Sequence, residues 1–338
     1  MPASYLRRGL IAVLLCVVLP AHSLAARSEF DVRTEALERA QSAVVGVISE
    51  AVEDAGSIAT LGPVRIGSGV IIGDDGLVLT IGYLILEAER VDLLLDGERR
   101  VPARVVAYDL ATGFGLLQAL WPLKREPVAL GHSAGLAIDA PLLVASGLPD
   151  GGLSLARLAS QRAFSGYWEY HIDSALFTVP PRGDHSGAGL FNLDGELLGI
   201  GSLVVGDAMG REAGRVPGNM FVPVDLLKPV IAEMRARGAS RGSTRAWLGL
   251  NCEERGGEVR VLRVTRDSPA ELAGVQPGDR ILRIDDAEVA ALETLWKTLW
   301  RDGAEREVRL TIRRGDEQQT LTVHATDRMR TLRRPQGI

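Results

Sequence analysis

The chain of 338 residues is long enough to form two or more domains, and its 46% hydrophobic and 24% charged residues are typical of folded globular proteins rather than disordered ones. The formal net charge of −5 argues against nucleic acid or an anionic membrane surface as the main partner. Glycine is abundant, with 38 residues, and aromatic residues make up only 5%, which suits short strands and many turns.

The first 26 residues have the pattern of a secretory signal peptide. Arg7 and Arg8 form a positive start, residues 10–20 form an apolar run, and small residues lead to Ala26. The apolar run is shorter than the roughly 20 residues that a membrane-spanning helix needs. We therefore expect cleavage near Ala26 and export to a bacterial periplasm. An uncleaved signal that anchors the chain in the membrane is the alternative.

The cysteines limit the chemistry available to the mature protein. Cys16 lies within the signal, so Cys252 alone remains after cleavage and no intramolecular disulfide can form. Two cysteines are also too few for a cysteine-rich zinc site, and we expect neither a metal nor a cofactor. Removal of the signal deletes two arginines and no acid, so the formal net charge changes from −5 to −7.

Residues 27–236 are expected to form one unit rich in strands. A helix followed by a strand is predicted within residues 27–50. Short apolar runs then alternate with turn signals, such as Asp74-Asp75-Gly76 and Asp96-Gly97-Glu98. Such a series predicts an antiparallel sandwich or barrel. A helix with an apolar face is expected to close this unit at 226–234.

A second, smaller unit is expected at residues 246–326. It follows a glycine- and serine-containing stretch, 237–245, whose composition predicts a flexible linker. Apolar residues between 292 and 300 recur with the spacing of one helix face, and predicted strands flank them. The basic tail at 327–338 is expected to be loose.

The second unit resembles a bacterial PDZ domain, an α+β fold. The resemblance rests on residues 245–250, Arg-Ala-Trp-Leu-Gly-Leu, and on residues 267–281, which contain a short predicted helix and a Pro-Gly-Asp turn. It covers the whole unit. PDZ domains bind peptide C-termini by adding the peptide as a strand to an open sheet edge beside a helix.

The resemblance also implies which residues bind the peptide. Backbone N–H groups of Leu248, Gly249 and Leu250 would hold the terminal carboxylate, and glycine suits the unusual backbone of such a loop. Leu292 and Trp296 would line the pocket for the peptide side chain. The alternative is that these two are core or helix-surface residues.

The first unit resembles the HtrA/DegP family of trypsin-like serine proteases. Three segments carry the resemblance in the right order and spacing: 67–80, which contains Gly-Ser-Gly-Val-Ile-Ile and Asp-Gly-Leu-Val-Leu-Thr; 186–200, which begins Ser-Gly-Ala-Gly-Leu-Phe-Asn; and 218–224. The resemblance implies a mainly β fold, a trypsin-like double β-barrel followed by the PDZ domain. It also implies that Ser186 occupies the position of the catalytic nucleophile.

The departures from the family pattern fall on the catalytic positions. Tyr83 stands where the family has its catalytic histidine, and Gly113 stands where it has the aspartate that orients this histidine. Asp109 matches an earlier acid that is not catalytic. Asp184 replaces the glycine whose backbone N–H completes the oxyanion hole. Losing one oxyanion donor costs about 10²–10³ in rate, and losing the base costs far more, so an efficient hydrolase is not expected.

No other residue is a convincing substitute for the missing base. His185 is adjacent to the serine, but neighbours on a tight loop point apart. His171 and His132 have no spacing that identifies them as bases, and Tyr83 is a poor base because an ordinary tyrosine pKa is about 10. The loop does not match the Gly-x-Ser-x-Gly elbow either, since Asp184 occupies the first glycine position.

The leading interpretation is an exported, proteolytically inactive HtrA-like protein. It would bind polypeptide segments or C-termini through its PDZ groove, in envelope protein quality control or as the regulator of an active HtrA-type protease. The alternative is a serine endopeptidase with a rearranged or weak active site built on Ser186. A third possibility is a structural envelope protein held by an uncleaved N-terminal helix. The family resemblance implies a trimer, with Phe30 as a candidate contact.

Overall fold

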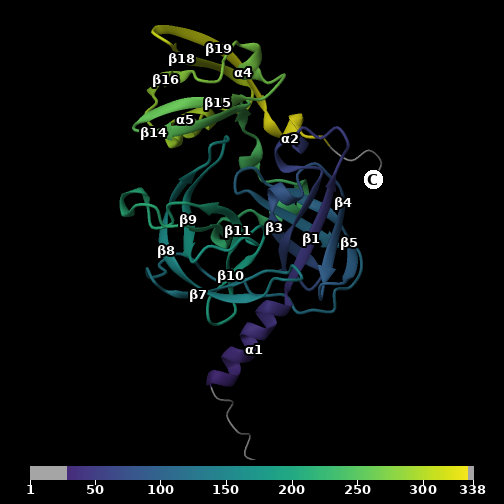
Figure 1. The fold of residues 1–338 in the computed structure, drawn as a ribbon. Helices are drawn as coiled ribbons and strands as arrows, with labels where there is room; N and C mark the ends of the chain where they lie inside the picture. Colours follow the sequence, from purple (N-terminus) through teal and green to yellow (C-terminus); the bar gives the residue numbers. More distant parts are fainter. Residues whose placement is uncertain (1–28, 334–338) are drawn as a thin grey trace, which may run out of the picture.

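The computed structural model describes residues 29–333, and the fold is mainly β, as expected: two closed barrels carry a separate sheet above them (Figure 1). The expected signal peptide at 1–26 and the end of the basic tail at 334–338 lie outside the described residues. The side chain of Phe30 lies outside them as well. Between residues 29 and 333, no helix combines the length and apolar character needed to cross a membrane.

The first barrel closes in the strand order β1-β2-β3-β6-β5-β4, with every neighbouring pair antiparallel. It follows helix α1 (Glu29–Ser42), which projects from the barrels on the side away from the PDZ unit (Figure 1). Its elements are β1 (Val44–Ala51), α2 (Ile58–Leu61), β2 (Val64–Ile71), β3 (Leu77–Ile81), the 3₁₀ turn η1 (Gly82–Leu84), β4 (Ala88–Leu95), β5 (Arg99–Tyr108) and β6 (Phe114–Ala119).

The second barrel repeats this architecture in the order β10-β11-β12-β9-β8-β7. Its long hairpin of β8 and β9 rises toward the PDZ unit (Figure 1). The elements are β7 (Pro141–Ala145), β8 (Leu153–Ser165), β9 (His171–Val179), β10 (Gly189–Phe191), β11 (Leu197–Val205), η2 (Arg211–Ala213), β12 (Gly218–Pro223), η3 (Val224–Leu226) and α3 (Ile231–Arg237).

The predicted hairpin turns are present, and their backbone explains the residues found there. Asp96 and Gly97 both have positive φ, 55° and 76°, between β4 and β5. Two successive positive φ angles match the twist of antiparallel strands, and Asp-Gly accepts them at low cost. Gly76 (φ 81°) plays the corresponding role between β2 and β3. Both barrels bury apolar side chains, and one continuous core spans them.

The PDZ unit is a sheet in the order β13-β19-β18-β16-β15-β14, with β17 paired to β16, and helices α4 and α5 pack against its strands. Ser268 caps α4 by accepting from the Glu271 N–H, and Pro269 begins the helix. The remaining elements are η4 (Arg241–Ser243), β13 (Ala246–Trp247), β14 (Leu250–Arg255), β15 (Glu258–Val264), α4 (Pro269–Leu272), β16 (Arg280–Ile284), β17 (Ala287–Glu288), α5 (Leu292–Trp300), β18 (Arg306–Arg314), β19 (Glu317–Asp327) and α6 (Arg328–Thr331).

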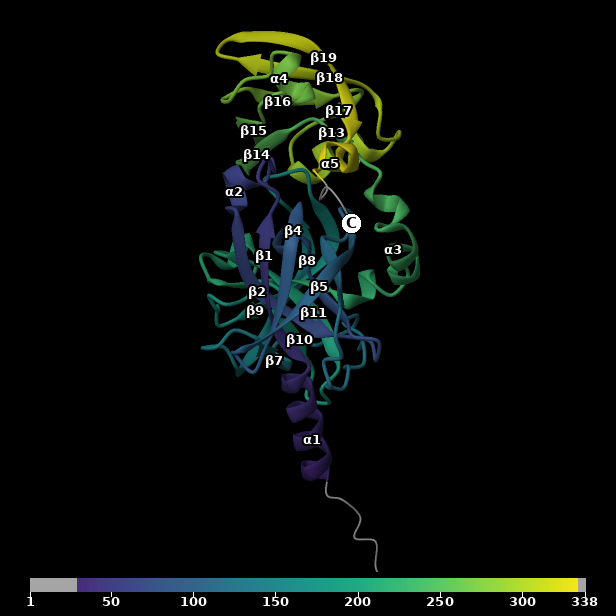
Figure 2. The same cartoon turned by 90° about the vertical axis from the view of Figure 1, so that its right-hand side faces the viewer.

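The segment between the two units is anchored, although its composition predicts flexibility. The buried Asp109 carboxylate accepts from the Ser240 N–H at 2.9 Å and from the Ser243 hydroxyl at 2.5 Å. The same carboxylate accepts from the backbone N–H and the hydroxyl of Thr112, at 3.0 and 2.7 Å. Figure 2 shows α3, which leads into this segment, lying along the side of the barrels. A buried carboxylate with four donors thus fixes the start of the PDZ unit.

The basic tail also contacts the body of the protein as far as it is described. The Arg328 guanidinium lies over the Trp247 ring, 4.5 Å from its centroid. The Arg333 N–H donates to the buried Glu87 carboxylate of the first barrel at 2.8 Å. The expectation of a loose tail is therefore wrong for residues 328–333, because a guanidinium and a backbone N–H along it contact one unit each.

Candidate functional site

The loop that contains Ser186 lies between the two barrels. The Ser68 N–H of β2 donates to the Ser186 carbonyl at 2.8 Å, and the Gly187 N–H donates to the Gly201 carbonyl of β11 at 2.9 Å. Gly187 has φ of 75°, and a Cβ there would lie 1.9 Å from the Ser68 carbonyl oxygen. Glycine after the serine is therefore required for the loop to dock on the first barrel.

Tyr83 brings a phenol to this serine from η1, directly after β3. Its oxygen lies 2.9 Å from the Ser186 hydroxyl oxygen and 2.8 Å from the Ser202 carbonyl oxygen. The single phenol proton cannot serve both, and a carbonyl can only accept. When the phenol donates to Ser202, the Ser186 hydroxyl therefore donates to the phenol oxygen. Sequence reasoning placed these two residues together, and the structure does so as well.

The phenol is unsuited to act as a general base. Burial raises the pKa of Tyr83 to about 12, although the hydrogen bond with Ser186 opposes the shift. A base must be unprotonated at the working pH, and catalytic bases have pKa values near it. At neutral pH the phenol keeps its proton and cannot take the one on Ser186.

The position at which the sequence predicts a missing acid, Gly113, leaves little room for a side chain. The Gly113 carbonyl accepts from the Gly82 N–H at 2.7 Å, which sets it beside the residue before Tyr83. Gly113 has φ of 81°, and a Cβ there would lie 3.0 Å from the Tyr170 hydroxyl oxygen. Tyr170 is buried, and its hydroxyl donates to the Thr112 carbonyl at 2.8 Å. A tyrosine of the second barrel thus occupies the space that an orienting carboxylate would need.

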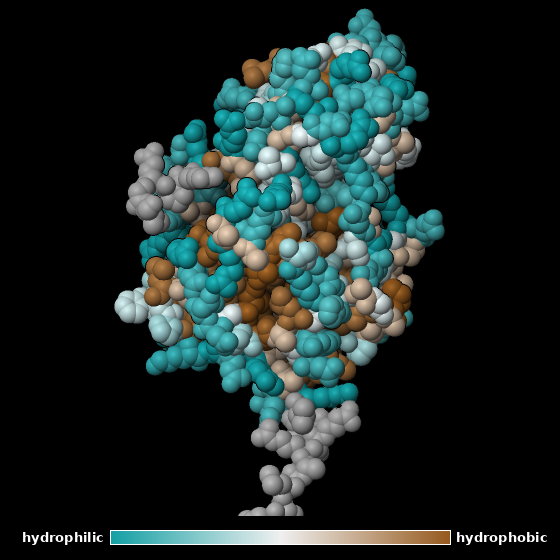
Figure 3. Space-filling model, turned by 180° about the vertical axis from the view of Figure 1, so that it is seen from behind, coloured by the Kyte–Doolittle hydropathy of each residue, from teal (hydrophilic) through white to brown (hydrophobic). Residues whose placement is uncertain are grey.

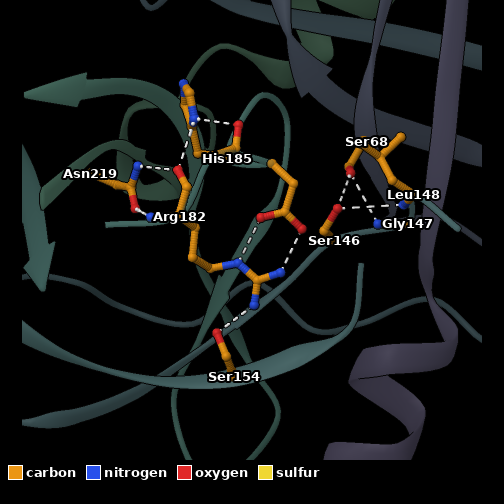
Figure 4. Close-up of polar contacts among 10 residues, drawn as sticks. Ser68, Ser146, Gly147, Leu148, Ser154, Arg182, His185 and Asn219 are labelled. Atoms are coloured by element: carbon orange, nitrogen blue, oxygen red, sulfur yellow. Dashed lines mark hydrogen bonds and ion pairs between the residues drawn. The ribbon is translucent and has the colours of Figure 1, made fainter. Parts of the chain in front are cut away.

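Asp184 lies in a network of its own beside the serine. Its carboxylate receives two hydrogen bonds from the Arg182 guanidinium, at 2.9 and 2.5 Å, and Arg182 also contacts Ser154 and Asn219 (Figure 4). The Arg182 contacts hold the pKa of Asp184 below its usual range, and the backbone N–H of Asp184 itself contributes. The arginine offsets much of the repulsion expected between this carboxylate and an oxyanion.

The histidines have other partners. Nδ1 of His185 lies 3.2 Å from the carbonyl oxygens of Arg182 and Gly183, pointing along its own loop (Figure 4). Burial lowers the pKa of His185. His171 lies at 2.8 Å from Ser165, and His132 is exposed at 3.0 Å from Lys228. Among the described residues, no hydrogen bond joins a histidine to Ser186.

One group of side chains has the composition of a metal site: His171, Asp173 and Glu293 bring ligand atoms within 4.8 Å of one another. The Lys297 ammonium already lies among them, 2.6 Å from Asp173 and 2.8 Å from Glu293. A lysine cation balances these acids, so the group is an ion-pair cluster. It joins β9 of the second barrel to α5 of the PDZ unit.

The predicted carboxylate loop of the PDZ unit holds a carboxylate of the protein itself. The Glu169 side chain accepts from the backbone N–H groups of Leu248 at 3.1 Å, Gly249 at 2.8 Å and Leu250 at 2.9 Å. Gly249 has φ of 87°, and a Cβ there would lie 2.3 Å from the Ser268 Cβ. The three amides therefore converge on one point, and only glycine fits the middle position.

The two helix residues expected at the peptide pocket lie in the core. Leu292 and Trp296 are buried among the apolar side chains of the PDZ unit. Trp296 also donates from its ring N–H to the Gly166 carbonyl at 3.1 Å, across the boundary between the units. Trp296 thus contacts the same hairpin that supplies Glu169, whereas no polar contact of Leu292 reaches it.

Comparison with known proteins agrees with this architecture. Residues 67–200 match the model of the trypsin-like peptidase domain, and residues 246–325 match that of the PDZ domain. The chain is 27% identical over 267 residues to the "Probable periplasmic serine endoprotease DegP-like" of Hahella chejuensis, and 28% identical over 272 residues to the protein of the same name in a Marinomonas strain. These alignments cover 74% and 76% of this chain.

The chain is an HtrA-like protein. It combines a trypsin-like peptidase fold with one PDZ domain. It spans 55% and 56% of the length of these two curated relatives. A solved structure titled "HtrA-type protease AlgW with decapeptide" covers 90% of this chain and 99% of its own, with a TM-score of 0.53 and 19% identity. At 19% identity this similarity supports the fold of the chain alone.

Three residues of the site were not found from the sequence: Glu169, Tyr170 and Arg182. Glu169 and Tyr170 lie in a segment with an available signal. Four of the 16 aromatic residues of the chain fall between positions 164 and 170, an aromatic concentration that is unusual in so aromatic-poor a sequence and indicates a packed contact. Arg182 has no such signal, because its role depends on the aspartate two residues later.

Proposed function

We propose that this HtrA-like chain is a pseudoprotease, exported to the periplasm, that binds polypeptide segments or protein C-termini through its PDZ groove. The barrels would then serve as a scaffold for the groove and not as a hydrolase. Envelope protein quality control, and regulation of an active HtrA-type protease, are the roles that such binding would serve. A homotrimer is the assembly that the family resemblance implies.

The pairing of Ser186 with Tyr83 carries this proposal. A serine needs a base within hydrogen-bond reach, and the group in reach is a phenol that stays protonated at neutral pH. The acid that would orient a histidine has neither a side chain nor space, since Gly113 lies against Tyr170. Two of the three parts of a triad are thus absent from the described site.

The geometry of the PDZ unit supports the binding part. Three backbone amides converge on a carboxylate, and β14 lies at the end of its sheet, where it can pair with an added strand. Two solved relatives have titles that state a bound decapeptide or tripeptide. Both observations favour a peptide as the ligand of this groove.

Labelling with a fluorophosphonate probe tests the loss of catalysis. The full chain without its signal is incubated with the probe beside an active HtrA-type protease, and Ser186→Ala serves as the matched control. We expect labelling of the active protease and none of this chain above the Ser186→Ala background. Casein cleavage should likewise be indistinguishable between the chain and its variant.

The competing function, a weak endopeptidase built on Ser186, makes the opposite prediction. Labelling that disappears in Ser186→Ala, together with casein cleavage that the same substitution abolishes, would overturn the pseudoprotease proposal. That result would not contradict the proposed peptide binding, because the amide loop and strand edge of the PDZ groove do not include Ser186.

A further inference from the structure

The turn that joins β8 to β9, which we call the hairpin tip (residues 166–170), lies against the PDZ unit (Figure 1). Trp168 forms an antiparallel bridge with Asn251 of β14, and the Tyr167 carbonyl accepts from the Cys252 N–H at 2.6 Å. The tip thus runs antiparallel to the edge strand β14 as a short additional strand. Main-chain pairing of this kind is how an extended peptide adds to a sheet edge.

The order of contacts along the tip is that of a peptide approaching its C-terminus. Tyr167 lies opposite Cys252, Trp168 lies opposite Asn251, and Glu169 reaches the amide loop that precedes them. The carboxylate of Glu169 is therefore at the end of an added strand, held by the three backbone N–H groups of the loop.

The tip is also held from the helix side and by its own packing. The Trp296 ring of α5 donates to the Gly166 carbonyl, so both walls of the groove contact the tip. The Trp168 and Tyr170 rings stack with centroids 5.6 Å apart and planes at 13°. Gly166 lies so close to the Trp168 ring that a Cβ would approach it to 2.9 Å. The packing of Gly166, Trp168 and Tyr170 thus forms a compact turn in which the Glu169 side chain reaches the amide loop.

We propose that the hairpin tip is an internal ligand of the PDZ groove, in which the Glu169 side chain takes the place of a peptide's terminal carboxylate. This inference rests on the proposed peptide-binding role of the groove and adds how that role is controlled. The same amides and the same strand edge cannot serve two ligands, so an external polypeptide binds only when the tip has left. On this proposal the ligands of the groove include chain segments in which a glutamate follows aromatic residues, as in Tyr167-Trp168-Glu169, in addition to free C-termini.

Hydrogen exchange tests whether the tip occupies the groove. In the wild-type chain without its signal, the amides of Leu248 and Gly249 have the Glu169 carboxylate as acceptor and should exchange slowly. We expect Glu169→Ala to accelerate both at least tenfold while amides of the β18–β19 pair remain unchanged. Glu317→Ala, at an exposed acid of the same unit, is the matched control and should change neither. Unchanged exchange in Glu169→Ala would overturn the internal-ligand proposal.

Peptide binding tests the competition. The probe is a fluorescein-labelled copy of residues 163–169 with an amidated end, so that the glutamate side chain is the single carboxylate of the peptide itself. We expect Glu169→Ala to bind it at least about tenfold more tightly than wild type, because the apparent affinity rises with the fraction of open grooves. Gly249→Ala, added to Glu169→Ala, should abolish binding, since a Cβ there displaces the amide loop. A probe ending in glutamine should bind weakly to all variants.

The two proposals fail in different ways. Equal binding of the probe to wild type and Glu169→Ala, sensitive to Gly249→Ala, would refute the internal ligand and leave a peptide-binding groove. Accelerated amide exchange in Glu169→Ala without any probe binding would retain the tip as the occupant of the groove. That same result would refute the proposed capture of external peptides of this class.

Discussion

At the scale of single residues, the site between the barrels shows a serine protease geometry in which a proton donor has replaced the proton acceptor. The Tyr83 oxygen lies at hydrogen-bond distance from Ser186, where a base would have to be. The contact between the barrels is therefore kept, and a phenol that holds its proton at neutral pH is consistent with the proposed loss of proton transfer. The hydroxyl pair is a structural link, and its removal should affect stability and not hydrolysis.

Replacement of the phenol hydroxyl should destabilise the barrels. Tyr83→Phe leaves the Ser202 carbonyl and the Ser186 hydroxyl without this partner, and an unsatisfied buried polar group costs about 1–3 kcal/mol. We expect a loss of that size in the free energy of unfolding measured by urea denaturation. Tyr167→Phe, at an exposed ring, should lie within about 0.5 kcal/mol of wild type. A Tyr83→Phe variant as stable as wild type would contradict the structural role.

Placing histidine and aspartate at the two predicted triad positions should not produce catalysis. In the variant with Tyr83→His and Gly113→Asp, the new aspartate meets positive φ and the Tyr170 hydroxyl, so it is strained by about 1–3 kcal/mol and cannot reach the histidine unhindered. We expect no fluorophosphonate labelling and a lower midpoint of urea unfolding than in Tyr83→His alone. Labelling that depends on Ser186 in the double variant would show that the site is only two substitutions from activity.

The residues at Tyr83, Gly113 and Ser186 could be brought together from the sequence because they follow strands in a family with a fixed topology. Tyr170 could not, because it comes from β8–β9 and meets Gly113 only through the packing of two barrels. Arg182 was missed for a related reason: its pairing with Asp184 depends on the shape of a loop, and a loop has no periodic pattern to read.

At the scale of elements, Asp109 turns a segment with linker composition into an ordered connection. Burial alone would raise the pKa of this carboxyl, but hydrogen bonds from Ser240, Ser243 and Thr112 outweigh burial and hold its pKa below the ordinary value. The sequence identified Asp109 only as an acid that is not catalytic. A glycine- and serine-containing composition predicts a flexible segment. It cannot show that a distant buried carboxylate accepts hydrogen bonds from the serines of that segment.

Removal of this acceptor should free the segment. Asp109→Ala leaves the Ser240 N–H and the Ser243 hydroxyl unpaired in a buried site and should cost about 3 kcal/mol in unfolding free energy. Limited proteolysis should then cut between residues 237 and 245 faster than in wild type. Asp74→Ala, at an acid on the β2–β3 turn, is the control. Equal cleavage rates in both variants would mean that the segment is held by other contacts.

At the scale of the whole molecule, the pH should set how firmly the PDZ unit holds the hairpin tip. Burial raises the pKa of Glu169 to about 7, although the amides of Leu250, Gly249 and Leu248 and the Arg328 charge oppose the shift. The buried Cys252 thiol, whose pKa is raised mainly by burial, is a further titratable group that interacts with it. A free glutamate titrates at about 4.3. Between about pH 4.3 and about pH 7, the state with the hairpin tip docked in the groove therefore binds more protons than the undocked state.

Docking should therefore weaken as the pH rises. Its favourable contribution is fully present below about pH 4 and is lost as the pH rises through about 7, because docking then buries a charged carboxylate. The labelled peptide of residues 163–169 presents the same glutamate to the same amides, so its affinity for the open groove of Glu169→Ala should fall between pH 5.5 and pH 8. In the wild-type chain docking of the tip weakens in parallel and frees more grooves, so the affinity should change less. An affinity that rises with pH in Glu169→Ala would contradict this sign.

The sequence predicted both folded units and the amide loop of the second, because each depends on local motifs. It could not predict that one unit inserts a turn into the other. That contact joins residues about 80 positions apart, Glu169 and Gly249, and depends on the relative placement of two units with separate cores. The two units also differ in surface hydropathy in the view of Figure 3: hydrophobic side chains gather over the barrels, and the surface of the PDZ unit is mostly hydrophilic.

The positions of the tryptophans give this protein a built-in optical reporter. Of its five tryptophans, Trp168 lies in the hairpin tip and Trp296 donates to the Gly166 carbonyl of the tip, while Trp247 and Trp300 lie beneath the guanidinium groups of Arg328 and Arg245. Trp121 is 68% exposed, in the segment that follows β6 of the first barrel. Replacing Trp121 with phenylalanine would leave an emission spectrum that comes from the other tryptophans alone. Departure of the tip could then be followed in real time, without a dye, on the unlabelled protein.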